Sequence, residues 1–325
     1  MRRLLTILAV SALSGPALAQ FIMGFEPPIV ADDAGILLTG QDGWYIPVAG
    51  SSDYNAYTYL NNALNVPQNP EGDNQFIGGL SLGGTAFARA QRDVDFGFAD
   101  VIAISYDILA RYDGTLPATQ NLGSFSTNPF LAANPQTHAC YNQLNTWVNL
   151  ATADAWNARY LAFNAAGAMD AQPGREPGPE WSNLEVNVWY RLRTVIDFNQ
   201  NRITEVSIQK VGGAVTTVQP VDYYLAGGQA GGLPRTTAVR FFAGGTTIGN
   251  LIAADNLRME AASVPCPGDL DGDGDVDQSD LGILLSDYGC VSPPAPDCPG
   301  DADGDGDTDQ SDLGILLGAY GAVCR

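Results

Sequence analysis

The stretch GDLDGDGDVDQSDLGILLSDYG, which begins at Gly268, recurs as GDADGDGDTDQSDLGILLGAYG from Gly300. The two copies agree at 18 of 22 positions at an offset of 32 residues. A Pro-rich and therefore stiff spacer, VSPPAPD, lies between them. A repeat of this quality indicates a tandem module in which each copy is one structural unit.

Within each copy, aspartates occupy loop positions 1, 3, 5, 7, 9 and 12, and glycine occupies position 6. Calcium loops of the EF-hand type take side-chain oxygens from positions 1, 3, 5 and 12, and a backbone oxygen from position 7. Oxygen-only ligands favour calcium over zinc or copper. We therefore expect two Ca²⁺ ions, held by Asp269, Asp271, Asp273, Asp275, Asp277 and Asp280 and by Asp301, Asp303, Asp305, Asp307, Asp309 and Asp312.

Two further expectations follow from this loop pattern. Because position 7 contributes its carbonyl, the side chains of Asp275 and Asp307 are expected to be solvated. Each loop runs into an apolar segment that is expected to form a short helix, and without metal the crowded carboxylates repel one another. The module is therefore expected to fold when calcium binds.

The pattern D-x-D-x-D-G-x-x-D-x-x-D-L followed by a short helix, given twice, resembles a type I dockerin over residues 266–325. The resemblance implies a small α module of two EF-hand-like loop–helix repeats. It also implies docking to a cohesin-like or other surface protein, usually in polysaccharide breakdown. The partner contacts that it implies, at loop positions 10 and 11, are Gln278, Ser279, Gln310 and Ser311.

Four of the five cysteines flank the repeats, and Cys140 stands apart with no role that the sequence fixes. Four cysteines allow three pairings, and sequence alone does not choose among them. The dockerin-like build implies the pairs Cys266–Cys324 and Cys290–Cys298, with 266–290 and 298–324 as the alternative. The flanking cysteines depart from the usual dockerin pattern. So do Ser286-Asp287 and Gly318-Ala319, which stand where the family usually has Lys or Arg.

The first nineteen residues are typical of a signal peptide. Arg2 and Arg3 precede an apolar run too short to span a bilayer, and Ala17-Leu18-Ala19 forms a small-x-small cleavage site. We expect cleavage after Ala19 and a secreted or cell-surface protein without a membrane span. The formal net charge of -21 makes binding to nucleic acid or to an anionic membrane surface unlikely.

Residues 20–262 show many short apolar or alternating runs between turn residues, which predicts a mostly β fold, a β-sandwich of the jelly-roll type. The best hairpin has arms in 187–198 and 203–211. A short helix is allowed over Thr146–Phe163. The brief segment 263–265 is expected to link this sandwich to the tandem module.

The sandwich also resembles concanavalin A-like or LamG-like jelly rolls, through Phe25-Glu26, the segment 40–44 and Asp255-Asn256-Leu257. This resemblance implies carbohydrate binding, and some such domains are glycoside hydrolases or lyases. Glu71-Gly72-Asp73 begins a hydrolase pattern but lacks its last Glu, and the only histidine, His138, lies in no catalytic signature. Binding is therefore favoured over catalysis. An O-glycosyl hydrolase with unidentified carboxylates and a structural surface adhesion protein are the alternatives.

Overall fold

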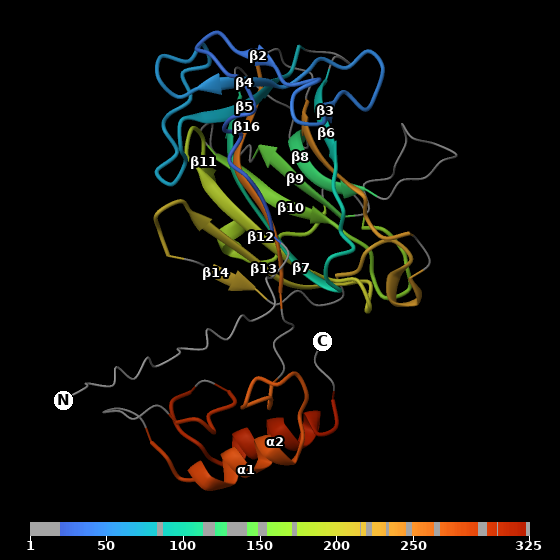
Figure 1. The fold of residues 1–325 in the computed structure, drawn as a ribbon, viewed down its shortest axis with the longest axis vertical. Helices are drawn as coiled ribbons and strands as arrows, with labels where there is room; N and C mark the ends of the chain where they lie inside the picture. Colours follow the sequence, from blue (N-terminus) through green and yellow to red (C-terminus); the bar gives the residue numbers. More distant parts are fainter. Residues whose placement is uncertain are drawn as a thin grey trace, which may run out of the picture.

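The computed structural model describes residues 20–82, 87–112, 121–128, 142–148, 155–170, 174–214, 216–218, 223–231, 234–244, 249–262, 267–291, 298–303 and 305–322. Within these ranges the chain is mostly β, with two α-helices near its C-terminal end (Figure 1). The expected signal peptide and the segment 263–265 lie outside the described residues. No helix in the described ranges is long and apolar enough to cross a membrane.

The larger of the two sheets in the described residues has nine strands, joined by antiparallel ladders. Along its main path the order is β14 (Thr216–Val218), β13 (Arg202–Lys210), β12 (Tyr190–Asp197), β7 (Val101–Arg111), β16 (Leu251–Ala261), β5 (Gln75–Leu80), β4 (Asn55–Thr58) and β2 (Ile36–Leu37). Strand β1 (Gln20–Met23) pairs with β16 beside this path. The expected hairpin is confirmed as β12 and β13, and Asn201 adopts the left-handed conformation in its turn.

The second sheet has seven strands within the described residues. Their order is β11 (Leu184–Glu185), β10 (Ala155–Leu161), β9 (Asn142–Val148), β8 (Asn121–Asn128), β15 (Ala238–Ala243), β6 (Ala88–Asp93) and β3 (Trp44–Tyr45). Short 3₁₀ turns lie at η1 (Pro179–Trp181) and η2 (Gly228–Ala230).

The two sheets pack face to face through one apolar core, so the expected two-sheet sandwich is present. Tyr106 and Leu192 enter this core from the larger sheet, and Trp156 and Phe241 enter it from the smaller one. Since successive side chains of a strand point to opposite faces, the odd residues of β7, among them Asp107, lie on the outer face of the larger sheet.

That outer face is itself largely covered. A second apolar cluster there joins the strand residues Phe76 and Leu109, and Trp189 just before β12, to Leu64 and Val66 of the loop that follows β4. Strand β7 is therefore buried on both faces, which explains why its sequence reads as an almost continuous apolar run.

The short helix that the sequence allowed over Thr146–Phe163 is not found in the described part of this segment, where residues 146–148 belong to β9 and residues 155–161 to β10. The side chains of Trp156, Ala158 and Tyr160 belong to the core, whereas Arg159 between them is half-exposed and paired with Glu176. This alternation has a period of two, which suits a strand and not a helix.

Helices α1 (Gln278–Asp287) and α2 (Gln310–Ala319) lie side by side and apart from the sheets in Figure 1. Their small core contains Val276, Leu284 and Leu316. Position 8 of each loop also hydrogen-bonds to the chain beyond the other helix: Thr308 pairs with Gly289 and Cys290, and Val276 pairs with Gly321 and Ala322. The loop of each repeat thus forms backbone hydrogen bonds with the end of the other repeat.

We predict that Phe241→Ala lowers the free energy of unfolding of the sandwich by about 3–5 kcal/mol. Its ring is fully buried and lies against Phe25, Trp44, Tyr106 and Phe125. Urea denaturation in calcium measures the loss. The matched change Leu60→Ala, at a 75% exposed side chain, should stay within about 0.5 kcal/mol. A loss of under about 1 kcal/mol for Phe241→Ala would mean that this ring is not central to the core.

Candidate metal centres and the buried polar cluster

The carboxylates of each repeat gather in the structure. Oxygens of Asp269, Asp271 and Asp273 lie within 4.8 Å of one another, and so do oxygens of Asp275, Asp277 and Asp280. In the second repeat, Asp312 joins Asp301 and Asp303 in one group and Asp307 and Asp309 in another. Glycine at position 6 permits the sharp turn, with φ of 95° at Gly274 and 98° at Gly306. These acidic clusters are suited to hold a cation.

The last aspartate of each loop also takes part in capping the helix that follows. The side chain of Asp277 accepts a hydrogen bond from the Ser279 backbone N–H, and Asp280 Oδ2 accepts one from the Asp277 N–H, which forms a capping box. Asp280 Oδ1 accepts two more, from the N–H groups of Leu270 and Asp271. Burial opposes ionisation of Asp280, but these N–H donors hold the pKa of its carboxyl below the usual value. The second repeat makes the equivalent bonds through Asp309 and Asp312.

The expectation that Asp275 and Asp307 are solvated is wrong for one oxygen of each. Their Oδ1 atoms are buried and accept no hydrogen bond from the described residues. Burial, followed by repulsion from neighbouring carboxylates such as Asp273 and Asp305, raises the pKa of both groups. A buried carboxylate oxygen without a donor calls for a positive partner. The acidic loops therefore fit a bound cation on their own geometry.

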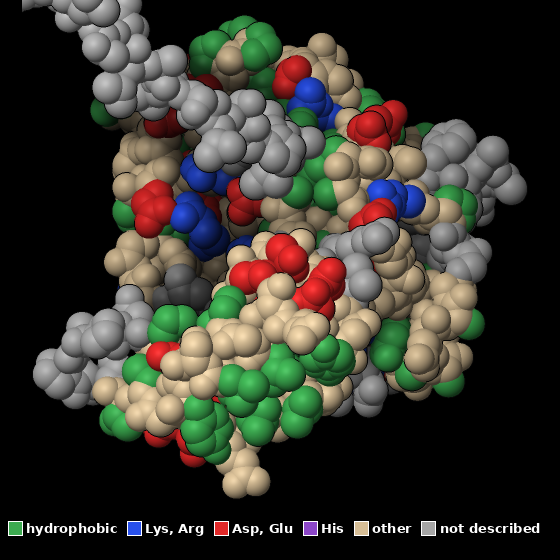
Figure 2. Space-filling view, turned by 60° about the horizontal axis from the view of Figure 1, so that its bottom comes forward, with side chains coloured by type: hydrophobic (Ala, Val, Ile, Leu, Met, Phe, Trp, Pro, Cys, Tyr) green, Lys and Arg blue, Asp and Glu red, His purple; other side chains and the backbone are tan. Residues whose placement is uncertain are grey.

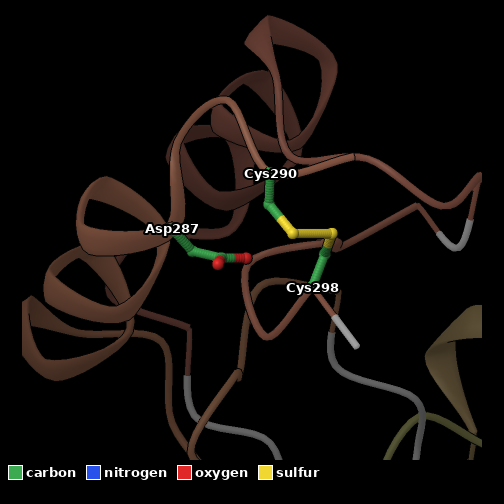
Figure 3. Close-up of side chains that lie close together, drawn as sticks. All are labelled: Asp287, Cys290 and Cys298. Atoms are coloured by element: carbon green, nitrogen blue, oxygen red, sulfur yellow. A yellow bond between two sulfur atoms is a disulfide. The ribbon is translucent and has the colours of Figure 1, made fainter. Parts of the chain in front are cut away.

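A disulfide joins Cys290 and Cys298, with Cα atoms 5.8 Å apart, and Asp287 lies beside it (Figure 3). This pair is one of the two that the dockerin-like build implies. It excludes the alternative pairing, in which Cys290 would bond to Cys266 and Cys298 to Cys324. Cys266, Cys324 and Cys140 lie outside the described residues. Asp287 Oδ2 accepts hydrogen bonds from the Gly300 N–H and the Thr308 hydroxyl, both at 2.8 Å. The end of α1 is thereby tied to the second loop.

We predict that Asp287→Ala speeds hydrogen exchange of the Gly300 amide by at least about tenfold, because the amide loses a charged acceptor. Exchange followed by NMR on the whole chain in calcium measures the change. Ser286→Ala serves as the control, since that hydroxyl bonds only to the Ile283 carbonyl within α1. Equal exchange in both variants would show that Asp287 does not hold the second loop.

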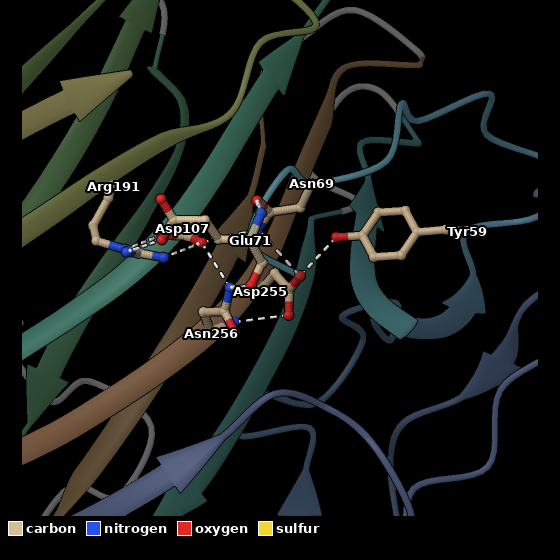
Figure 4. Close-up of polar contacts among 7 residues, drawn as sticks. All are labelled: Tyr59, Asn69, Glu71, Asp107, Arg191, Asp255 and Asn256. Carbon is tan, nitrogen blue, oxygen red and sulfur yellow. Dashed lines mark hydrogen bonds and ion pairs between the residues drawn. The ribbon is translucent and has the colours of Figure 1, made fainter. Parts of the chain in front are cut away.

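The sandwich contains its own cluster of charged side chains, on the outer face of the larger sheet (Figure 4). Arg191 on β12 binds Asp107 on β7 through two hydrogen bonds, Nε to Oδ1 at 2.7 Å and Nη2 to Oδ2 at 2.9 Å. Its Nη1 also binds Glu71 Oε2 at 2.6 Å. Because Glu71 belongs to the loop after β4, these bonds fasten that loop to the sheet.

The other half of the cluster is centred on Asp255. Its Oδ2 accepts hydrogen bonds from the Tyr59 hydroxyl at 2.7 Å and from Asn69 Nδ2 at 3.2 Å. Strand β16 is irregular between Asp255 and Arg258, and Asn256 has a φ of 49° there. Such a bulge re-aims side chains. Asn256 Nδ2 thus reaches Asp107 Oδ2 at 2.8 Å and links the two carboxylates.

This arrangement is suited to anchoring a loop and not to catalysis. Asp107 and Asp255 are fully buried beneath the loop, with relative exposures of 0%. A Cβ atom on Gly72 would lie 2.3 Å from Asp255 Oδ2, so the loop backbone approaches too closely for any other residue. Glu71, which begins the incomplete hydrolase pattern, is paired with Arg191. His138 lies outside the described residues.

We predict that the sandwich loses stability as the pH rises from about 4 to about 7 through Asp255. Burial raises the pKa of this carboxyl from 3.8 to about 7, against opposing hydrogen bonds from Tyr59 and the Asn256 N–H. Between these values the folded chain keeps a proton that the unfolded chain releases, so unfolding becomes easier by up to about 1.4 kcal/mol per pH unit.

Urea denaturation at several pH values in saturating calcium measures this slope. Asp255→Asn should flatten it, because the amide does not titrate in this range. The control Glu260→Gln removes a carboxylate elsewhere on the same strand and should keep the wild-type slope. Parallel curves for wild type and Asp255→Asn would contradict the assignment.

No protein-family model and no curated protein matches this chain. Among solved structures it is similar to an endo-β-1,4-glucuronan lyase from the fungus Trichoderma reesei, with 12% identity, 70% of this chain and 94% of that chain covered, and a TM-score of 0.39. It is also similar to a GH131 β-glucanase catalytic domain from Podospora anserina, with 14% identity, coverage of 65% and 79%, and a TM-score of 0.37. A third similar structure is lectin I-B4 from Griffonia simplicifolia, with 11% identity, coverage of 74% and 98%, and a TM-score of 0.35.

Proposed function

We propose that this is an exported calcium-binding protein with two parts, a β-sandwich over 20–262 and a dockerin-like module over 266–325. One Ca²⁺ ion binds in each acidic loop of the module. The observation that carries this proposal is that the Oδ1 atoms of Asp275 and Asp307 are buried inside clusters of carboxylates and accept no hydrogen bond from any described residue. A divalent cation supplies the positive charge that these loops need in order to fold.

The aspartates of each loop differ in how they would bind the cation. Asp280 and Asp312 are held rigidly by backbone N–H groups, so they present a fixed carboxylate to a cation. The more exposed Asp271 and Asp273, which cluster with Asp269, supply further oxygens from the loop itself. Hard oxygen ligands in a flexible loop suit Ca²⁺ better than the more demanding Mg²⁺.

We also propose that the module docks the chain to a cohesin-like or other surface protein outside the cell. Gln278, Ser279, Gln310 and Ser311 are exposed at the starts of the two helices, where a partner can reach them. Leu285 and Leu317 are more than half exposed on the same helices, at equivalent places in the two repeats. Figure 2 shows hydrophobic side chains gathered on this end of the molecule beside acidic ones. An apolar surface of this kind supports docking.

For the sandwich we propose binding of carbohydrate in polysaccharide breakdown. The two buried carboxylates of the polar cluster hold a loop, which leaves them no part in hydrolysis. The large aromatic residues Trp44, Trp156 and Trp181 are fully buried in the core, so they do not form a platform for sugars. A binding surface is therefore expected elsewhere on the sandwich.

Calorimetric titration of the whole mature chain with Ca²⁺, after chelation, tests the metal proposal. We expect two ions per chain and a gain of helix signal in far-UV circular dichroism. Asp280→Ala and Asp312→Ala should each abolish binding at one loop, since each removes both a ligand and the capping box that starts the helix.

The control Glu260→Gln removes one carboxylate from the sandwich and should leave both sites intact. A chain that takes up no calcium, or one with a native spectrum in excess chelator, would refute the proposal. Mg²⁺ in place of Ca²⁺ provides the comparison for selectivity.

A further inference from the structure

A small open cleft of about 210 Å³ lies on the larger sheet where strands β2, β4 and β5 meet. Its apolar wall consists of Leu37, Leu80 and Leu82, and the ring of Tyr57 lies among them. Leu37 and Leu82 are 62% and 55% exposed, although both are large apolar side chains. The cleft is smaller than the pockets of drug-sized ligands and corresponds to about seven water molecules.

Polar side chains lie at one side of this cleft. Asp53 and Ser52 line it, and Asp53 Oδ1 and Ser52 Oγ are buried atoms that have no hydrogen-bond partner within the described residues. The other oxygen of Asp53, Oδ2, accepts the Thr39 N–H at 2.7 Å, which fixes the carboxylate in place. Asn55 completes this polar side next to Tyr57. The cleft thus places fixed acceptors beside an apolar wall.

We propose that this cleft binds one neutral sugar ring at the end of a glycan. A pyranose has hydroxyl donors for the Asp53 carboxylate and C–H faces that pack on the exposed side chains of Leu37 and Leu82. The carboxylate, in a chain of net charge -21, repels uronic acids and other anionic sugars. This inference rests on the proposed carbohydrate-binding role of the sandwich and gives that role a site and a ligand class.

The probes are glucose, galactose, mannose, xylose and glucuronate, added to the whole mature chain in calcium and followed by saturation-transfer NMR. We expect at least one neutral sugar to bind with a dissociation constant of roughly 1 mM, as suits a shallow site with few contacts. Because the cleft holds a single ring, the free monosaccharide should compete with its own oligosaccharide for binding.

Two variants examine the cleft itself. Asp53→Asn removes the charged acceptor but keeps an oxygen for the Thr39 N–H, and it should weaken binding about tenfold. Leu37→Ser removes an exposed apolar wall without disturbing the core, and it should weaken binding as well. Asp95→Asn is the control for the first, since its carboxylate also accepts a backbone N–H, from Gly97. Leu60→Ser, at an exposed leucine outside the cleft, is the control for the second.

The outcomes separate this inference from the proposed function. Loss of binding in both cleft variants and not in the controls supports the cleft. Sugar binding that survives Asp53→Asn and Leu37→Ser overturns the cleft and leaves carbohydrate binding by the sandwich standing. No binding of any neutral sugar to the wild-type chain overturns both. Tighter binding of glucuronate than of glucose overturns the assignment to neutral sugars.

Discussion

The carboxylate that ends each acidic loop is the group on which the small module depends. Asp280 lies in the first turn of α1 and accepts hydrogen bonds from the N–H groups of Leu270 and Asp271 at the start of the loop and of Asp277, the residue that caps the helix. One buried side chain thus joins the loop to the helix. Folding of the helix and closure of the loop are therefore one event, and a cation that relieves the crowded charge favours both together.

The sandwich also contains a buried carboxylate, and an arginine neutralises it. Asp107 is a buried charge in the middle of an apolar strand, and such a charge is tolerated only when it is paired and hydrogen-bonded. Arg191 supplies the pairing, and Asn69 and Asn256 supply further donors. The same bonds hold the loop after β4 against the sheet, so that its Leu64 and Val66 cover the second apolar cluster. The cleft at β2, β4 and β5 adjoins this cluster through Tyr57, which lines the cleft and packs on Phe76.

What the sequence predicts well is local. All candidate ligands of one loop lie within twelve consecutive residues, so their spacing alone indicates the acidic clusters that the structure brings together. The hairpin of β12 and β13 is likewise a local pattern. The buried polar cluster, in contrast, joins residues of β7, β12, β16 and a loop. These residues lie far apart in the sequence, and the hydrophobic pattern of a single strand does not predict which of them meet. The cluster's one local signal is a lone carboxylate inside the apolar run VIAISYDILAR, which calls for a partner without naming it. The short helix allowed over 146–163 was not found for a related reason. A short apolar run fits a helix as well as a strand, and only the neighbouring strands decide between them.

Two of the four differences between the two repeats are explained by the contacts that the repeats make with each other. Asp287 in the first copy corresponds to Ala319 in the second, and Val276 in the first corresponds to Thr308 in the second. In the structure Asp287 hydrogen-bonds to Thr308, while Ala319 packs on the small core that contains Val276. The two repeats are thus in contact through a polar pair, Asp287 and Thr308, on one side of the module and through an apolar pair, Val276 and Ala319, on the other. Exchange of a single member would leave a carboxylate against a valine or a hydroxyl against an alanine, each with a lost partner. The residues at these positions therefore match one another in pairs, and the module has two distinct sides although its acidic loops are nearly identical.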